Sequence, residues 1–148
     1  MKKILSFCAF VLIATLMVAG CAKVPESPIE SGMMTANADG GFNASSCIES
    51  FVLSGTEDYY ITGKSTDRNS SIIIRIRTSK LQLGTYYFDG TQEANTAWYI
   101  SNNNTMWASS GSVTIASDSA GVATSGTFTF NALHGPVVSG GSFRAIFR

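Results

Sequence analysis

Residues Ser71 to Arg77 read Ser-Ile-Ile-Ile-Arg-Ile-Arg and indicate the fold class most directly. Successive side chains of an extended strand point to opposite faces of a sheet. One face of this segment is wholly aliphatic and consists of Ile72, Ile74 and Ile76. The other face carries Ile73, Arg75 and Arg77. The stretch therefore predicts a β-strand with one face in the core and one face toward solvent.

The same alternation recurs along the chain, between turn residues spaced eight to twelve positions apart. Apolar residues alternate with polar ones at Val113 and Ile115, at Phe128, Phe130 and Ala132, and at Phe143, Ala145 and Phe147. Turns are expected at Asp39-Gly40-Gly41, Asp89-Gly90, Asn102 to Asn104, Asp118 to Gly121 and His134-Gly135-Pro136. One helical turn is expected over Thr91 to Thr96. The pattern predicts an all-β domain of roughly eight to ten strands, either an antiparallel β-sandwich or a closed or partly closed barrel.

The N-terminus has the pattern of an export signal. Lys2 and Lys3 precede an uncharged run from Ile4 to Val18, which is shorter than the ~20 residues that span a bilayer. The run ends in Val18-Ala19-Gly20-Cys21, which resembles a bacterial lipoprotein lipobox. The resemblance implies acylation of the Cys21 thiol and cleavage before it. The alternative is an ordinary secretory signal cut near Ala19-Gly20.

These features divide the chain into a signal peptide (residues 1–20), a lipidated cysteine with a flexible tether (21–32) and a β domain (33–148). Pro25, Pro28, Ser and Glu residues give the tether its coil-like composition. Lipid on Cys21 would hold the domain at a membrane, and we expect the outer membrane. Some lipoproteins that this chain resembles carry an acidic run directly after the cysteine, which directs them to the cell surface. No such run follows Cys21, so the resemblance favours a periplasm-facing position.

Charge and cysteine content narrow the function classes. Ten Lys and Arg residues balance ten Asp and Glu residues, and no basic cluster suggests a nucleic-acid partner. With Cys21 lipidated, Cys47 has no intramolecular cysteine partner in the mature chain. We expect Cys47 to be buried and inert rather than reactive or bridged to another molecule.

Several strand-and-turn motifs occur in a recognisable order. They are Met34-Thr35-Ala36 followed by Gly40, Gly84-Thr85-Tyr86, Gly111-Ser112-Val113-Thr114-Ile115, Gly126-Thr127-Phe128-Thr129-Phe130-Asn131-Ala132, and Gly141-Ser142-Phe143. This succession resembles an uncharacterised family of Bacteroidota lipoproteins and covers essentially the whole mature domain. Asp39 departs from the asparagine that the family usually has before its first turn glycine. The resemblance implies the fold and the location in the cell envelope, but it assigns no catalytic residue to this chain.

Residues for catalysis are sparse. His134 is the only histidine and is expected in a solvated turn, and no G-x-S-x-G motif occurs. Glu57, Asp58, Asp67 and Asn69 lack the spacing of a calcium loop and are interpreted as a solvated hairpin tip, with calcium binding as the alternative. We therefore expect no enzyme activity, no cofactor and no metal site, although an acid pair of a hydrolase would be spatial rather than sequential.

Aromatic residues are the better candidates for a site. Trp98, Tyr99 and Trp107 flank the expected Asn102 to Asn104 turn, and adjacent strand residues point to opposite faces. Exposed rings of this kind stack on sugars or anchor a protein partner. Separately, Asp118-Ser119-Ala120 resembles an acceptor for bacterial O-glycosylation at Ser119, against a plain turn as the alternative.

The sequence thus predicts a lipid-anchored, non-catalytic binding module of the cell envelope, with a glycan, a peptide or an envelope protein as partner. The alternatives are a structural or accessory envelope component without a small ligand, and a hydrolase.

Overall fold

The computed structural model describes residues 32–53, 57–65, 69–119 and 122–147. Across these residues it contains ten β-strands and no helix, which confirms the all-β prediction. The strands are β1 (Met33–Asn37), β2 (Phe42–Ala44), β3 (Cys47–Leu53), β4 (Glu57–Lys64), β5 (Ser70–Arg77), β6 (Gly84–Phe88), β7 (Thr96–Ser101), β8 (Asn104–Ser119), β9 (Ala123–Ala132) and β10 (Val137–Phe147). The export segment and the tether lie outside the described residues.

The strands within the described ranges form one sheet that closes on itself. Seven of them make a ring in the order β10-β3-β4-β5-β7-β8-β9, because β9 pairs with both β8 and β10. The pairs around this ring are antiparallel except that of β10 with β3, which is parallel. The outer strands β1, β2 and β6 attach to β10, β1 and β8, respectively. Of the two predicted architectures, the chain forms a closed barrel.

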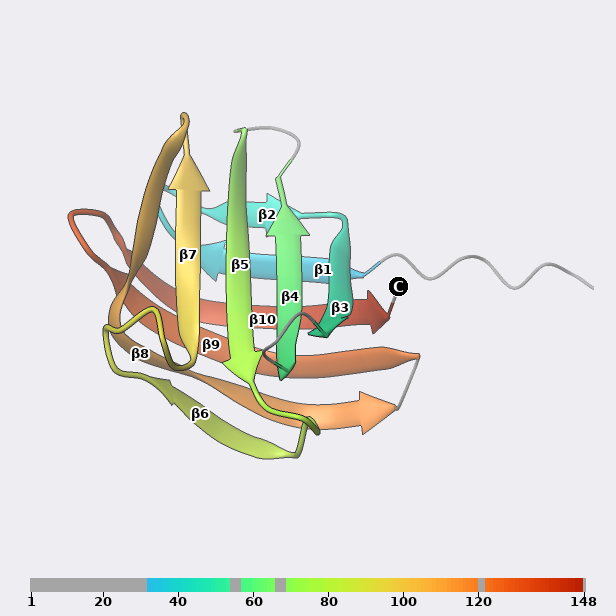
Figure 1. The fold of residues 1–148 in the computed structure, drawn as a ribbon. Helices are drawn as coiled ribbons and strands as arrows, with labels where there is room; N and C mark the ends of the chain where they lie inside the picture. Colours follow the sequence, from blue (N-terminus) through green and yellow to red (C-terminus); the bar gives the residue numbers. More distant parts are fainter. Residues whose placement is uncertain (1–31, 54–56, 66–68, 120–121, 148) are drawn as a thin grey trace, which may run out of the picture.

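The barrel has two walls whose strands cross steeply (Figure 1). Strands β3, β4, β5 and β7 make one wall, and β1, β9 and β10 run across behind them. The long strand β8 belongs to both walls, since its first part pairs with β7 and its later part with β9 and β6. Register shifts interrupt β8 between Ala108 and Ser110 and between Ile115 and Ser117. Bulges of this kind bend a strand and allow it to turn the corner between the walls.

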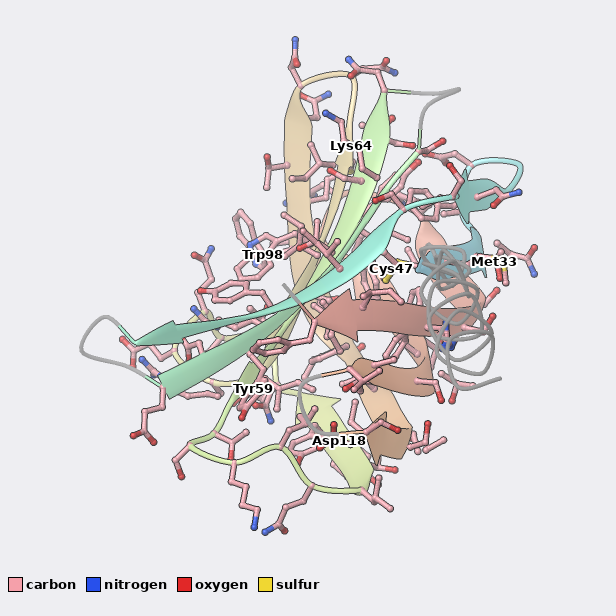
Figure 2. All side chains as sticks on the ribbon, turned by 90° about the vertical axis from the view of Figure 1, so that its right-hand side faces the viewer. Met33, Cys47, Tyr59, Lys64, Trp98 and Asp118 are labelled. Atoms are coloured by element: carbon pink, nitrogen blue, oxygen red, sulfur yellow. The ribbon has the colours of Figure 1, made fainter. Side chains whose placement is uncertain are left out.

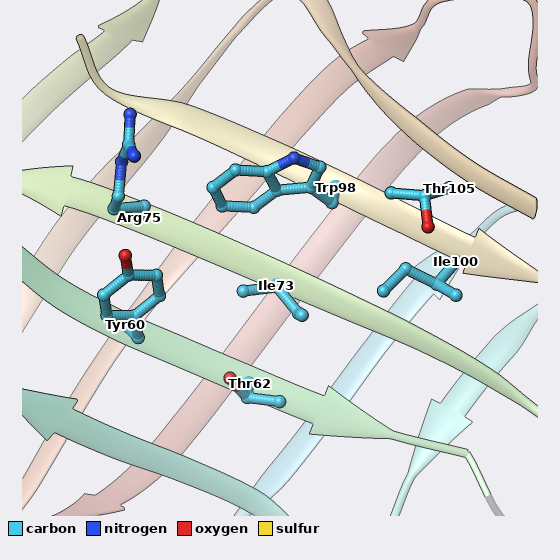
Figure 3. Close-up of a pocket in the computed structure, with 7 residues that line it drawn as sticks. All are labelled: Tyr60, Thr62, Ile73, Arg75, Trp98, Ile100 and Thr105. Carbon is cyan, nitrogen blue, oxygen red and sulfur yellow. The ribbon is translucent and has the colours of Figure 1, made fainter. Parts of the chain in front are cut away.

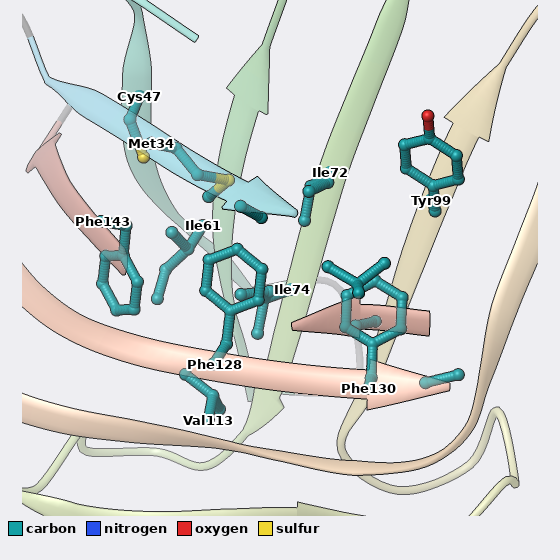
Figure 4. Packing of buried hydrophobic residues seen from close by; sticks show 14 of the residues in the cluster. Met34, Cys47, Ile61, Ile72, Ile74, Tyr99, Val113, Phe128, Phe130 and Phe143 are labelled. Atoms are coloured by element: carbon teal, nitrogen blue, oxygen red, sulfur yellow. The ribbon is translucent and has the colours of Figure 1, made fainter. Parts of the chain in front are cut away.

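Apolar side chains from every strand of the ring fill its interior. The predicted alternation is confirmed at the centre of the first wall, where Ile72, Ile74 and Ile76 of β5 are fully buried. Val113 and Ile115 of β8 and Phe128 and Phe130 of β9 meet them from the other strands. Figure 4 shows these side chains converging between the two walls. Cys47, at the start of β3, is also fully buried, as predicted.

Two phenylalanines of the second wall lie over glycines of the neighbouring strand. Phe128 is the register partner of Gly141, and Phe143 is the register partner of Gly126. A Cβ atom on Gly141 would lie 2.6 Å from the Phe128 ring, and one on Gly126 would lie 2.9 Å from Cζ of Phe143. Backbone carbonyl oxygens add to the crowding, with that of Thr114 at 2.0 Å from the Gly126 Cβ position and that of Phe128 at 2.6 Å from the Gly141 one. These positions therefore exclude larger side chains. The two rings then pack with centroids 6.3 Å apart.

The expected turns have the backbone that Asn, Asp and Gly tolerate. Asp39, Gly40 and Gly41 all have positive φ angles, and so do Asn102 and Asn103 between β7 and β8. Ser101 pairs with Asn104, so the turn is a two-residue hairpin loop with both central residues left-handed, as in type I′. His134 also has a positive φ, of 58°.

Two local predictions were wrong. Residues 92–95 form bends rather than a helical turn, and Thr96 begins β7. The carbonyls of Gln92, Glu93 and Ala94 accept hydrogen bonds from arginine side chains of β5, which directs them away from helical partners. Phe147 was expected to continue the buried face of β10 but is 40% exposed. The reason is positional, since it is the last residue of the strand.

The division of β5 into two faces can be tested on neighbouring isoleucines. Ile74→Ala should lower the free energy of unfolding by about 2–5 kcal/mol, because it leaves a cavity in the filled interior. Ile73→Ala removes the same atoms from the partly exposed outer face and should cost clearly less. Urea unfolding of both variants measures the difference. Equal losses would contradict the assigned faces.

Candidate functional site on the outer wall

The outer side of the first wall carries an open hollow of about 560 Å³. It lies over β4, β5, β7 and the start of β8, on the side opposite the core. Its lining residues are Tyr60, Thr62, Ile73, Arg75, Trp98, Ile100 and Thr105 (Figure 3). Each strand of this wall pairs with a neighbour along both edges. The floor of the hollow is therefore a continuous hydrogen-bonded sheet, which holds the lining side chains in fixed register.

Trp98 lies at the centre of this surface. It is the register partner of Ile73 on β5 and of Trp107 on β8, so the three side chains share the outer face. Trp98 and Trp107 are both partly exposed. Figure 2 shows Trp98 projecting from the outer side of the wall, whereas Cys47 lies within the barrel. The structure thus places the two predicted tryptophans side by side on the hairpin that the Asn102-Asn103 turn closes.

Tyr99, the third predicted aromatic, lies on the other face. It is 2% exposed and belongs to the core cluster, because it neighbours Trp98 in an extended strand and must point the opposite way. Figure 4 shows its ring inside the barrel. Tyr99 therefore does not share the surface that Trp98 presents, and we leave it out of the candidate site.

Arg75 joins the hollow to the loop before β7. Its Nη2 donates to the carbonyl oxygen of Ala94 at 2.8 Å and also to that of Gln92. Its Cζ lies 5.5 Å from the centroid of the Trp98 ring, within the range of a cation–π contact. Arg75 is also the register partner of Tyr60, whose hydroxyl points toward it in Figure 3. These contacts fix the guanidinium at one end of the hollow.

The loop over residues 89–95 is held at several further points. Arg77 donates from Nη1 to the carbonyl of Glu93, and its backbone N–H donates to Oδ1 of Asn95 at 2.9 Å. At the start of the loop, Oδ1 of Asp89 accepts hydrogen bonds from the N–H and the hydroxyl of Thr91. These two hydrogen bonds stabilise the charged form and hold the pKa of Asp89 below its usual value. The loop beside the hollow therefore has a defined conformation.

The interpretation of the acidic segment as a solvated hairpin tip was wrong for Asp58. This residue is 4% exposed, and its Oδ1 lies 3.6 Å from Nε of Arg77. Glu57 and Asp58 begin β4, whereas Asn69 precedes β5 at the opposite end of this strand pair. Strand pairing places these residues at opposite ends of β4 and β5 although they are near in sequence. Glu57, Asp58 and Asn69 therefore do not meet at one site. Asp67 lies outside the described residues.

The remaining predicted residues lie apart from the hollow. Ser119 ends β8 and is exposed, and the neighbouring Asp118 accepts a hydrogen bond from Thr124 at 3.3 Å. Ala120 of the same motif and the lipobox Cys21 lie outside the described residues. His134 is exposed in its turn, where Gly135 N–H donates to the carbonyl of Ala132 at 3.1 Å.

The described part of the chain offers neither a metal site nor a membrane-spanning helix. It holds no group of three or more His, Cys, Asp or Glu side chains arranged to bind a metal ion. None of the described residues belongs to a helix that is long and apolar enough to cross a membrane. A second, smaller hollow of about 290 Å³ lies over β8, β9 and β10 and is lined mainly by Ser, Thr and Gly residues.

Sequence reasoning found Trp98 but missed most of its neighbours. Tyr60, Thr62 and Arg75 come from strands distant in sequence, and only the register of β4, β5 and β7 brings them together. A signal was present in β5, where alternation places Arg75 on the outer face. No local pattern relates that residue to Trp98, since their contact depends on the strand pairing.

Comparison with known proteins gives the family. A family model described as a domain of unknown function, DUF6252, matches residues 31–146. Neither a curated protein nor a solved structure matches the chain. The matched region includes every described strand, apart from the last residue of β10. The chain therefore belongs to the DUF6252 family, as the resemblance to an uncharacterised family suggested.

Proposed function

We propose that this protein is a lipid-anchored, non-catalytic binding module of the cell envelope, and that its ligand binds the hollow around Trp98. The observation that carries the proposal is the partly exposed Trp98 ring, held on the outer wall between Ile73 and Trp107. Aromatic rings in concave, largely apolar surfaces with a few polar groups are typical of ligand sites. The volume of about 560 Å³ lies within the usual range for such sites.

The lining supports binding rather than catalysis. Among the described residues that form the hollow, Arg75 is the one with a charged side chain, and none is a His, Cys, Asp or Glu. General acid–base and nucleophilic mechanisms draw on those residue types, placed within hydrogen-bond reach of one another. Asp58, a buried carboxylate on the same wall, is ion-paired with Arg77. These features favour a surface that holds a ligand without transforming it.

The proposed location in the cell envelope rests on the sequence. The Lys2-Lys3 start, the uncharged run and the Val18-Ala19-Gly20-Cys21 ending are what a lipoprotein signal requires. The segment from Cys21 to the first strand is only eleven residues long, and a coil of this length reaches about 18 Å. The domain would then work close to the membrane, in our proposal at the periplasm-facing side of the outer membrane. Ser119 stays a predicted O-glycan acceptor.

Replacing Trp98 tests the binding site. Screening the detergent-solubilised full-length protein against envelope glycans and peptides should give ligands whose affinity falls at least about tenfold in Trp98→Ala. Tyr87→Ala is the matched control, because this ring is 72% exposed on β6 and does not line the hollow. It should leave affinity unchanged, and both variants should keep the β circular dichroism.

Two outcomes would contradict the proposal. If no small ligand binds but another envelope protein co-purifies stably through a different surface, the protein is an accessory component. If a bound glycan or peptide is cleaved, the protein is a hydrolase.

Replacing Cys21 tests the anchor. Cys21→Ser removes the thiol that would carry lipid, so the protein should be processed poorly or released from membranes. Fractionation of cells that produce the two forms, with mass spectrometry of the mature N-terminus, measures this directly. A variant that stays with the membrane fraction as the wild type does would show that lipid at Cys21 is not the anchor.

A further inference from the structure

The charge of Arg75 is the feature of the hollow that the binding proposal leaves unused. Its Nη2 donates to two backbone carbonyls, which are neutral acceptors. The ion pair on this wall joins Asp58 to Arg77 rather than to Arg75. Within the described residues no carboxylate neutralises the Arg75 guanidinium. Because the two carbonyls take Nη2, the N–H groups of Nη1 are left as donors for an anionic group.

The same neighbourhood contains buried polar atoms that lack partners. In the described residues neither Nε of Arg75 nor Oγ1 of Thr96 has a hydrogen-bond partner, and Thr96 is 1% exposed. Arg75 and Thr96 are register partners on β5 and β7. Because both atoms are buried, Nε gives the Arg75 guanidinium no further partner within the described part of the wall. An anionic group at Nη1 would form a charge-assisted hydrogen bond with the guanidinium and compensate its charge.

The rest of the lining is suited to a sugar ring. A pyranose has an apolar C–H face and a rim of hydroxyls. Trp98 supplies an aromatic face, and Tyr60, Thr62 and Thr105 supply hydroxyl groups that donate and accept. Arg75 lies beside Trp98, so one ligand can stack on the indole and extend an acidic substituent to the guanidinium.

A peptide fits this surface less well. Extended peptides bind by adding a strand to a free sheet edge, but β4, β5 and β7 are paired along both edges. Helical peptides place a row of apolar anchors into a long groove, whereas this hollow is an open surface with a cation at one end.

We infer that the hollow binds an acidic saccharide, with a sugar ring on Trp98 and the acidic substituent of the sugar at Arg75. This inference rests on the proposed function and names the ligand class of the same site. The geometry assigns Arg75 as the specificity-determining residue, because it is the lining group that distinguishes a charged sugar from a neutral one. Recognition of the charge should weaken as salt concentration rises.

The test uses trigalacturonic acid and its methyl ester, two trisaccharides that differ in charge but share the ring skeleton. Binding to the detergent-solubilised full-length protein is measured by calorimetry. The acid should bind at least about tenfold more tightly than the ester. Arg75→Gln should abolish this preference, and Arg75→Lys should keep part of it because the positive charge remains. Lys80→Gln is the control, since it removes one exposed positive charge that does not line the hollow.

The outcomes separate this inference from the proposed function. Equal binding of acid and ester, lost in Trp98→Ala, would overturn the acidic class and leave the binding module standing. An acid preference that survives Arg75→Gln would assign the charge recognition to another residue and overturn the inference. Binding of neither trisaccharide would also overturn it, while the wider ligand screen would still decide the proposed function. A preference lost in Arg75→Gln and kept in Lys80→Gln supports it.

Discussion

The closed ring of seven strands, with its interior filled by apolar side chains, is the constraint on which the rest of the molecule depends. A barrel of about eight strands is just wide enough for its own side chains to fill, and here every strand of the ring contributes to the core cluster. Phe128, Phe130 and Phe143 occupy much of this space from the second wall. Because apolar side chains fill the interior, the ligand site that we propose lies on the outer surface.

Strand β5 contributes side chains both to the core and to the outer hollow. Its inward isoleucines are fully buried and hold the wall to the core, while Ile73 and Arg75 contribute to the outer hollow. A site built on paired strands is positioned more accurately than one built on loops. The loop over residues 89–95, beside the hollow, is tied to β5 by Arg75 and Arg77. The core and the proposed binding site thus share one backbone and use its opposite faces.

The parts of this arrangement that could be predicted from sequence are the local ones. Alternation identified the buried faces of β5, β8 and β9, and Gly, Asn and Asp residues identified the turns. Barrel closure could not be predicted, because it depends on the parallel contact of β10 with β3 at Ile146 and Phe147, and neither segment carries a signal for the other. Trp98 was found as an outward aromatic, but Arg75 beside it depends on strand register. Asp58 was misjudged for the same reason, since its partner Arg77 lies on the neighbouring strand.

Recognition on the outer wall of a filled barrel is tested most directly by NMR of the isoleucine methyl groups. Titration of the labelled full-length protein with trigalacturonic acid should shift the methyl signals of Ile73 and Ile100, which line the hollow. The signals of Ile72, Ile74 and Ile76, which lie on the inner face of the same wall, should stay in place. Shifts of the inner set with Ile73 and Ile100 unchanged would place the ligand inside the barrel and contradict the account.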